Sequence, residues 1–377
     1  MSARRARKRP AKGAVGETKV SVLELSEHPE LLTGVDELRA RVYPDHPEAR
    51  DARRHAEVWS WLGRHPLARE MRRWVLTTGE GQVVGHLASL PQHYRIAGKR
   101  VVAHTPADYQ VLPGYGFHAV SLMRRFFRTA ENCVSADQVA GAMAVQGRFG
   151  AEMAGPLRYE AKLLDPSRIP RVPAPLHPLL APARWGMRAL DATLPGLFGR
   201  GPEVDVLDGF DASFDDLFER VAASVPCAPE RDATFLRWRY GTGSPPYPVT
   251  ILGVREAGSA SGTLLGYAVL RVGEDGQNGY VLDLTASPGR DDVAWSLLRE
   301  SVRFFRRAGV YMVRYRFATS PTSPQPRDLR GLGFFSRPGR AHTLMVRFAD
   351  CGLHKTALDA ANWSYTTGDG EAGFWVI

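Results

Sequence analysis

The chain has 377 residues, of which 44% are apolar, so it is long enough for two globular domains with cores of ordinary composition. No stretch approaches the roughly 18 uninterrupted apolar residues of a membrane span. No apolar segment follows the basic N-terminus, so we expect neither a membrane span nor a secretory signal. The three cysteines lie far apart without CxxC spacing, which favours a reducing, cytoplasmic location.

The net charge of +9 is concentrated near the N-terminus. Residues 1–19 hold seven Lys or Arg residues and one Glu, so the rest of the chain carries only about +3. We expect residues 1–18 to form a disordered basic tail. Such a tail can contact nucleic acid or anionic lipid, or serve only solubility. The second interpretation is favoured, and we expect no specific nucleic-acid partner.

Two parts of the chain begin alike. Residues 19–48 and 203–230 both open with a V-x-V-L strand pattern, continue into a helix-like stretch and close on Pro-Glu. The string RFFRTA (125–130) returns as RFFRRA (303–308) at nearly the same offset. These matches indicate two copies of one unit of about 145 to 150 residues.

Further matches follow in the same order. Gly85 corresponds to Gly266, and Pro113 and Pro288 each end a strand-like run that leads into a helix. Residues 157–165 and 342–350 both have the pattern of a closing strand.

The repeat divides the chain into segments. We expect one domain over residues 19–165, a second over 203–350, and a C-terminal extension over 351–377. Residues 166–202 between the copies contain eight prolines, which excludes regular helix from the start of this linker. A short helix with its apolar face packed in the core is expected around Trp185, Met187, Leu190 and Leu194.

Each copy has the same expected order of elements. A first strand and one or two helices precede three consecutive strands, the first two joined by a glycine-rich hairpin turn such as TGEGQ (78–82). A Pro-bearing loop then leads into a long amphipathic helix, another strand, a helical turn region and a final strand. In the second copy this helix places apolar side chains at helical spacing between Val293 and Phe305.

This order of elements, β–α–α–β–β–β–loop–α–β–α–β, resembles the GNAT (GCN5-related N-acetyltransferase) fold, twice. The chain resembles bacterial tandem GNAT proteins over about residues 19–370. In addition, FLRWRYGTGSPPYPVTILGV (235–254) and ANWSYTTGDGE (361–371) resemble segments of GNAT-like proteins from exopolysaccharide gene neighbourhoods. The resemblance implies a mixed α/β (α+β) fold with two acyl-CoA N-acyltransferase domains.

The resemblance also implies where acetyl-CoA or another acyl-CoA binds. In this family the pantetheine arm lies along the fourth strand, and the pyrophosphate sits on backbone N–H groups where the next helix begins, an arrangement that suits an anion. In the first copy the strand is DYQVLP (108–113) and the loop is GYGFHA (114–119). The expected cofactor-binding residues are Val111, Leu112, Gly114, Gly116, Phe117, His118 and Ala119.

The loop departs from the family signature R/Q-x-x-G-x-G/A. No Arg or Gln stands at the expected spacing, and an ordinary turn is the alternative interpretation for Gly114 and Gly116. The second copy departs further, because Asp291 and Asp292 follow Arg290 and repel a pyrophosphate. We therefore expect the first copy to hold the cofactor and the second to complete the substrate cleft.

The implied chemistry is acyl transfer from a thioester to an amine. Asp108 is the candidate general base, and Tyr109 and Tyr115 are the candidate acids for the leaving thiolate. A purely structural role for Asp108, as a cap or ion-pair partner, is the alternative. Asp283 and Tyr315 are the counterparts in the second copy, for which core positions are favoured.

Other kinds of site are not indicated. His86, His93 and His104 lack metal-ligand spacing, so no metal is expected, and FLRWRY (235–240) is interpreted as a helix end packed on the sheet rather than a stacking surface. The sequence therefore predicts a cytoplasmic acyl-CoA-dependent N-acyltransferase acting on an amine of a sugar, amino acid or small metabolite. The alternatives are a degenerate GNAT-like binding module and a peptidoglycan-bridge-type aminoacyl transferase that uses charged tRNA.

Overall fold

The computed structural model describes residues 19–45, 50–136, 138–169, 180, 182, 185, 186, 201–256, 262–337 and 342–371. The basic tail and most of the Pro-rich linker, including Met187, Leu190 and Leu194, lie outside the described residues. Trp185, expected in the core, is instead 67% exposed. No helix in the described part of the chain has the length and apolar character needed to cross a bilayer.

The first half follows the expected order of elements, with one further strand at its end. Its strands and helices are β1 (Val20–Glu24), α1 (Leu32–Val42), α2 (Ala52–Leu62), β2 (Arg72–Thr78), β3 (Val83–Ile96), β4 (Lys99–Val111), α3 (Ala119–Thr129), β5 (Cys133–Ser135), α4 (Ala140–Gly147), β6 (Glu152–Pro156) and β7 (Arg158–Leu163). A 3-10 turn, η4 (Gly116–His118), leads from β4 into α3.

The second half repeats this order, with a further short strand between its first two helices. Its elements are β8 (Asp205–Leu207), α6 (Ser213–Ser224), β9 (Cys227–Pro229), α7 (Ala233–Tyr240), β10 (Thr250–Arg255), β11 (Leu264–Val272), β12 (Asn278–Ala286), α8 (Asp291–Arg307), β13 (Met312–Phe317), α9 (Pro326–Gly331), β14 (Phe335–Ser336) and β15 (Thr343–Arg347). The C-terminal extension adds α10 (Cys351–Ala357) and the turns η8 (Ala360–Asn362) and η9 (Thr367–Asp369).

Local sequence explains the boundaries of these elements. The side chain of Asp51 accepts a hydrogen bond from the Arg54 N–H and caps α2, and Asp232 caps α7 in the same way through Phe235. Between β3 and β4 the chain turns at Ala97 and Gly98, which both have positive φ, as a tight hairpin requires. Helix α8 buries the apolar side of its amphipathic pattern against β11 and β12.

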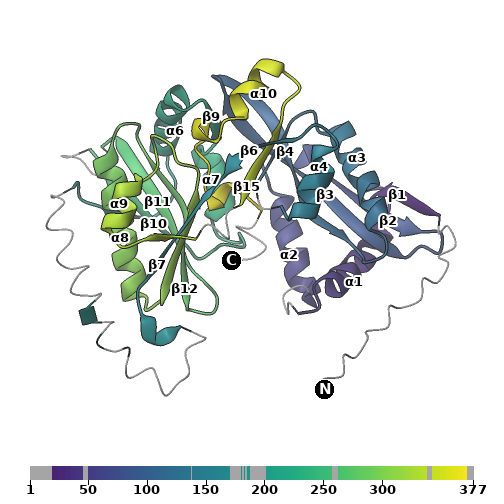
Figure 1. The fold of residues 1–377 in the computed structure, drawn as a ribbon, viewed down its shortest axis with the longest axis horizontal. Helices are drawn as coiled ribbons and strands as arrows, with labels where there is room; N and C mark the ends of the chain where they lie inside the picture. The colour runs from purple at the N-terminus through teal and green to yellow at the C-terminus, as the bar shows by residue number, and fades with distance from the viewer. Residues whose placement is uncertain are drawn as a thin grey trace, which may run out of the picture.

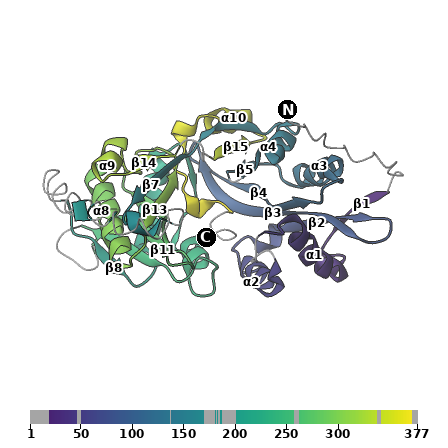
Figure 2. The same ribbon diagram turned by 60° about the horizontal axis from the view of Figure 1, so that its bottom comes forward.

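The last strand of each half lies in the sheet of the other half. The first sheet has the order β1-β2-β3-β4-β5-β15-β6, with β9 of the second half also paired to β3, and the second sheet has the order β14-β7-β13-β12-β11-β10-β8. Strand β15 therefore pairs with β5 and β6, and β7 pairs with β13 and β14 (Figure 2). A division of the chain by sheet thus differs from a division at residues 165 and 202. Exchange of strands ties the two halves into one body, seen side by side in Figure 1.

Two tryptophans join equivalent helices of the two halves. Trp61 of α2 and Trp238 of α7 stack with ring centroids 4.4 Å apart and planes 4° from parallel. Each indole N–H donates to the main-chain carbonyl of the other, at 2.8 and 3.1 Å. The two residues are 177 positions apart, close to the offset of the sequence repeat, so the pair lies near a pseudo-twofold axis. In agreement with the sequence interpretation, α7 packs within the protein and carries this contact.

We predict that Trp238→Ala lowers the free energy of unfolding by about 3 kcal/mol, because it removes a large ring from a packed junction. Trp238→Phe keeps a smaller stacked ring but loses the indole donor, so its cost should be lower, about 1–2 kcal/mol. Urea denaturation measures both. Unfolding midpoints for Trp238→Ala that equal those of the parent would show that the stack does not stabilise the junction.

Candidate functional site

Strand β4 carries a β-bulge at the point where it separates from β5. The β3–β4 register shifts between His86 and Ala88, and Asp108 on the bulged strand has φ +49°, unusual for a residue with a side chain. Within the described residues, the pairing of β4 with β5 is confined to His104 and Cys133. From the bulge to Val111, β4 therefore borders a fork between the two strands.

The Asp108 side chain is buried in a charged cluster behind the bulge. Its carboxylate accepts hydrogen bonds from Arg39 at 2.5 Å and from Gln110, and lies 3.2 Å from His86 Nδ1. Burial alone would raise the pKa of Asp108, but the contacts with His55 and His86 and the charge of Arg39 outweigh it and hold the pKa well below the usual value. The carboxylate is therefore ionised and a weak base.

Aromatic and basic side chains hold this cluster rigidly. The Arg73 guanidinium lies 3.6 Å from the centroid of the Trp59 ring and its Nε–H donates to His86 Nε2 at 3.3 Å. His86 Nδ1–H in turn donates to the main-chain carbonyl of Asp108 at 3.0 Å, so the network assigns His86 as neutral. Burial lowers the pKa of His86 and lowers the pKa of Arg73 to about 10.

His55 completes the cluster on the side of the helices. Its Nδ1 lies 2.5 Å from Asp36 Oδ1, and its Nε2 accepts the indole N–H of Trp59 at 2.8 Å. These contacts fix α1 and α2 against the bulge.

A carboxylate from the C-terminal end of the chain reaches into the fork. Glu371 Oε2 accepts the main-chain N–H of Asp108 at 3.0 Å, and Glu371 Oε1 accepts Gln138 Nε2 at 2.8 Å. Gln138 also donates to the carbonyl of Pro106 on β4, at 3.0 Å. Glu371 thus bridges β4 and the segment between β5 and α4.

The loop after β4 is open. Gly114 has φ +97°, and a Cβ added to Gly114 or Gly116 would meet no atom within 4 Å. In the described part of the chain, the N–H groups of Gly114, Gly116 and Phe117 make no hydrogen bond to a protein acceptor. Phe117 is 86% exposed, and its ring lies edge-on to that of His118, 5.9 Å between centroids. Glycine and unpaired N–H groups here suit the close approach of an anion.

The other predicted cofactor residues differ in exposure. Leu112 is buried in the core and its N–H donates to the Val84 carbonyl at 2.9 Å, so its side chain supports the loop from below. Val111 and Ala119 are half-buried, on either side of the loop.

The two predicted acids occupy different environments. Tyr109 donates its hydroxyl to the carbonyl of Ala119 at 2.8 Å, which ties β4 to the start of α3, and burial raises its pKa. Tyr115 is half-buried against the core and its ring lies 6.4 Å from that of His118. Both residues flank the loop, as expected, and the structure commits the Tyr109 hydroxyl to a main-chain partner.

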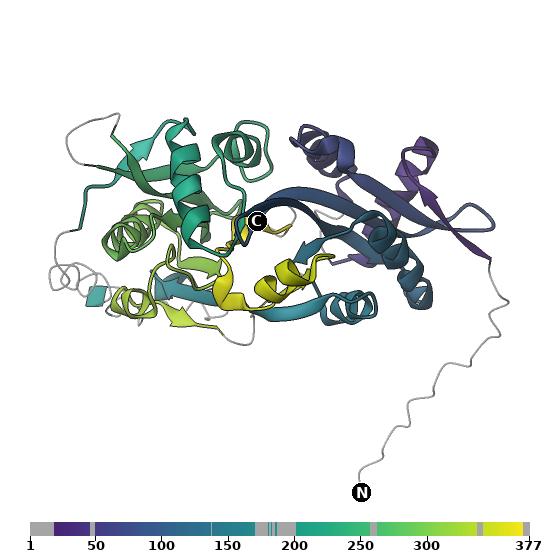
Figure 3. The same ribbon diagram turned by 90° about the horizontal axis from the view of Figure 1, so that it is seen from above.

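In the second half, the corresponding fork is filled by the protein itself. Strand β12 carries a bulge one or two residues from the equivalent position, since its register with β11 shifts between Val269 and Leu270. Residues 364–370 are buried, and η9 within them contacts both β12 and β13. Thr366 forms a β-bridge with Phe317, and a Cβ on Gly368 would lie 3.0 Å from the Leu282 carbonyl oxygen. Figure 3 shows this C-terminal segment, in yellow, between the two sheets.

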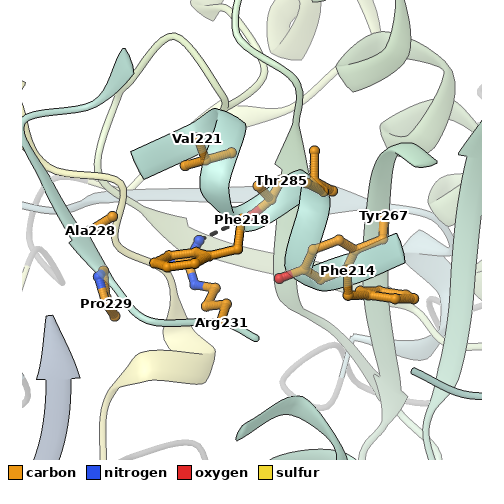
Figure 4. Close-up of a pocket in the computed structure, with 9 residues that line it drawn as sticks. Phe214, Phe218, Val221, Ala228, Pro229, Arg231, Tyr267 and Thr285 are labelled. Atoms are coloured by element: carbon orange, nitrogen blue, oxygen red, sulfur yellow. Dashed lines mark hydrogen bonds between the residues drawn. The ribbon is translucent and has the colours of Figure 1, made fainter. Parts of the chain in front are cut away.

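A buried arginine fixes the segment in that fork. Arg231 pairs with Asp369 at 2.5 Å, and it donates to Thr285 Oγ1 at 3.0 Å and to the Ser364 carbonyl at 2.9 Å. Figure 4 shows Arg231 and Thr285 beside Tyr267 and the phenylalanines of α6. The void that these side chains enclose measures about 10 Å³, room for at most one water molecule.

The loop before α8 is also unsuited to phosphate. Asp292 pairs with Arg290 at 2.7 Å, which neutralises the one cation expected there, and Asp291 pairs with Arg327 at 3.0 Å. The surface hollow beside Arg290 is lined by five carboxylates and two guanidinium groups, from Glu203, Asp205, Asp208, Asp211, Glu256, Arg255 and Arg290. Asp283 and Tyr315 are each 1% exposed, in agreement with core positions. The fork of the second half is therefore filled, whereas the glycine loop of the first half is exposed.

The histidines of the first half serve hydrogen bonds and packing. His104 Nδ1 lies 2.8 Å from Ser89 Oγ, and burial lowers the pKa of His104 to about 4. Among the residues that the structure describes, no group of three His, Cys, Asp or Glu side chains is placed to bind a metal.

Sequence reasoning missed several residues of this site. Arg39 lies 69 positions from Asp108, Gln138 about 30 positions away and Glu371 263 positions away. Tyr43, at the end of α1, is also close, because the charges of Asp108 and Glu371 add to burial in raising its pKa. No local sequence pattern connects residues that lie so far apart in the chain.

We predict that Asp108→Asn destabilises the protein in a pH-dependent way. The folded-state pKa of Asp108 lies below its unfolded value, so the carboxylate contributes stability above about pH 4 and loses that contribution as the pH falls further. The loss should be about 3–5 kcal/mol at pH 7, because Arg39 is left beside a neutral group, and smaller at pH 3. Urea denaturation at both pH values, with the exposed Asp205→Asn as control, measures it. A difference that is independent of pH would contradict this account.

Comparisons with known proteins locate the fold. No family model matches the chain, and no curated protein matches it in sequence. An N-acetyltransferase related to GCN5 from Anabaena variabilis has a TM-score of 0.55 at 13% identity, over 88% of this chain and 73% of that protein. An N-myristoyltransferase from Saccharomyces cerevisiae with bound myristoyl-CoA has a TM-score of 0.56 at 10% identity, over 90% of this chain and 84% of that protein.

A third similar structure has the same overall organisation. It is a tandem GNAT protein from the clavulanic acid biosynthesis pathway, with a TM-score of 0.50 at 15% identity, over 87% of this chain and 98% of that protein. These likenesses, together with two mixed sheets built from repeated elements, confirm the predicted fold class. The chain has the GNAT acyltransferase fold in two tandem copies.

Proposed function

We propose that the protein is an acyl-CoA-dependent N-acyltransferase that binds its cofactor in the first half only. One observation carries the proposal: the fork beside β4 is bordered by an open glycine loop, whereas the equivalent fork in the second half is filled by residues 364–370. Neighbours that bind myristoyl-CoA support a CoA ester as the donor. The acceptor is an amine on a sugar, amino acid or small metabolite.

The cofactor would lie along β4 and end at the start of α3. Strand residues from Tyr109 to Val111 present main-chain groups to the fork, where a pantetheine arm can pair with them as an added strand does. The pyrophosphate would rest on the N–H groups of Gly116 and Phe117, at the positive end of the helix. Gly114, His118 and Ala119 shape that loop, and Leu112 supports it.

The reacting thioester would then lie at the bulge. The main-chain N–H of Asp108 points into the fork and can donate to the thioester carbonyl oxygen as negative charge develops there. The Asp108 carboxylate, with its lowered pKa and its bond to Arg39, holds that N–H in place. This geometry favours the structural alternative for the carboxylate over its predicted role as the base, and it favours Tyr115 over Tyr109 as the proton donor to the thiolate.

A binding module without catalysis is the second candidate. It is favoured by the loop sequence, which lacks the Arg or Gln of the family signature. Such a module would bind CoA weakly or not at all. The peptidoglycan-bridge alternative depends on the basic tail, which lies outside the described residues.

We predict that acetyl-CoA at 100 times its Kd stabilises the protein by about 2.7 kcal/mol, and that Gly116→Glu abolishes this gain. A Cβ at this exposed position would meet no atom within 4 Å, so we expect the fold to be preserved while the new carboxylate repels the phosphates. Gly209→Glu, at an exposed position in the second half that is equally unobstructed, is the matched control and should retain binding. Thermal unfolding with and without acetyl-CoA measures this stabilisation in the parent and in both variants. Absence of stabilisation in the parent would refute the proposed function.

We also predict that Phe117 contributes a stacking surface for the adenine of CoA. Base–aromatic stacking is worth about 1–3 kcal/mol, so Phe117→Ala should weaken acetyl-CoA binding roughly tenfold. S-acetylpantetheine lacks the adenosine group, and its affinity should not change. Because Phe117 is 86% exposed, the substitution leaves the core intact. Calorimetric titration measures the affinity of Phe117→Ala for both ligands. An equal loss of affinity for acetyl-CoA and for S-acetylpantetheine would show that Phe117 does not contact the adenine.

A further inference from the structure

Glu371 is brought to the fork of the first half by the second half. The preceding residues form η9, which is held by the Arg231–Asp369 ion pair, and the Gly370 carbonyl accepts Arg239 at 2.7 Å. The position of the Glu371 carboxylate is therefore fixed from the side of the second sheet, while it accepts hydrogen bonds from Asp108 and Gln138 of the first.

The carboxylate lies where the chemistry of acyl transfer requires a base. Its Oε2 accepts the same Asp108 N–H that would polarise a thioester carbonyl, at 3.0 Å. Its Oε1 has a separate donor, Gln138, at 2.8 Å. When a thioester oxygen takes the Asp108 N–H, the bond to Gln138 can keep the carboxylate beside the carbonyl carbon. An amine attacking that carbon passes within reach of Glu371.

The other carboxylates near the fork are differently placed. Asp108 contacts the guanidinium of Arg39 and has a pKa well below its usual value. Asp36 lies 2.5 Å from His55 Nδ1, on the side of the helices. The Glu371 carboxylate instead lies within the fork, where it accepts hydrogen bonds from the Asp108 N–H and from Gln138.

We propose that Glu371 is the general base of the transferase, supplied to the active site of the first half by the C-terminal segment. This inference rests on the proposed function. Glu371 takes a proton from the attacking amine as the new C–N bond forms, the C–S bond of the thioester breaks, and the CoA thiolate leaves and takes up a proton. With water as the nucleophile the same carboxylate accepts the proton of the attacking water, and acetate and CoA are the products. Gln138 is a positioning residue for Glu371.

The test compares Glu371→Gln with Glu80→Gln, an identical change at an exposed position in the β2–β3 turn. Acetyl-CoA is the probe, calorimetry measures its binding, and thiol release at high protein concentration measures its hydrolysis by water. Glu371→Gln should bind acetyl-CoA within about threefold of the parent and release CoA about 100-fold more slowly. Glu80→Gln should match the parent, and Gln138→Ala should fall between them.

A pH profile separates catalysis from a merely structural role. The parent rate should fall on the acid side as the carboxylate is protonated, and Glu371→Gln should lose this dependence. An unchanged rate in Glu371→Gln, loss of acetyl-CoA binding in that variant, or a parent that binds acetyl-CoA without releasing CoA above the uncatalysed rate would each overturn the role of Glu371. A parent that does not bind acetyl-CoA overturns the proposed function first, and calorimetry detects this before any rate is measured.

Discussion

The buried ion pair of Arg231 and Asp369 connects the features that make the two halves different. Burial of both charges is costly, and the pair is stable because Thr285 and the Ser364 carbonyl also accept hydrogen bonds from the guanidinium. Loss of one partner would leave the other charge buried alone, at a cost of about 3–5 kcal/mol. The pair thereby keeps residues 364–370 in the second fork and directs the following residue, Glu371, to the first.

The two bulges show how one fold gives two electrostatic environments. Asp108 and Asp283 occupy matching positions on β4 and β12. Contacts with His55 and His86 and the charge of Arg39 lower the pKa of Asp108, whereas burial and the nearby charge of Asp369 raise the pKa of Asp283 despite Arg231. The first bulge is thus built around an ionised carboxylate, on the strand that leads into the exposed glycine loop. The second is part of a closed core, and its role is to hold the C-terminal segment.

The sequence predicted the features of the fold that depend on local pattern. The V-x-V-L strands, the hairpins and the amphipathic helix α8 all follow from periodicity, and the repeated strings placed them in two copies. The same reasoning could not predict the strand exchange, because residues 157–165 and 342–350 have the same closing-strand pattern and either one satisfies either sheet. Pairing between strands that are more than a hundred residues apart in the sequence depends on the whole fold, and the residue pattern of one strand does not determine which strand it pairs with.

The residues of the candidate site also fall into those that the sequence predicted and those that it did not. Gly114, Gly116 and Asp108 were found because each lies in a short segment with a distinctive pattern. Glu371 and Gln138 were missed, since their importance comes from tertiary contacts between segments that are remote in sequence.

Strand exchange also bears on how the proposed active site is assembled. Strand β15 belongs by sequence to the second copy, yet it pairs with β5, the strand that forms one side of the first fork. The second copy therefore contributes a structural neighbour of the fork, and the C-terminal extension contributes the carboxylate within it. A first half alone would leave the outer edge of β5 unpaired and its fork without Glu371. The second copy, whose own fork is filled by residues 364–370, is thus a structural part of the proposed site in the first.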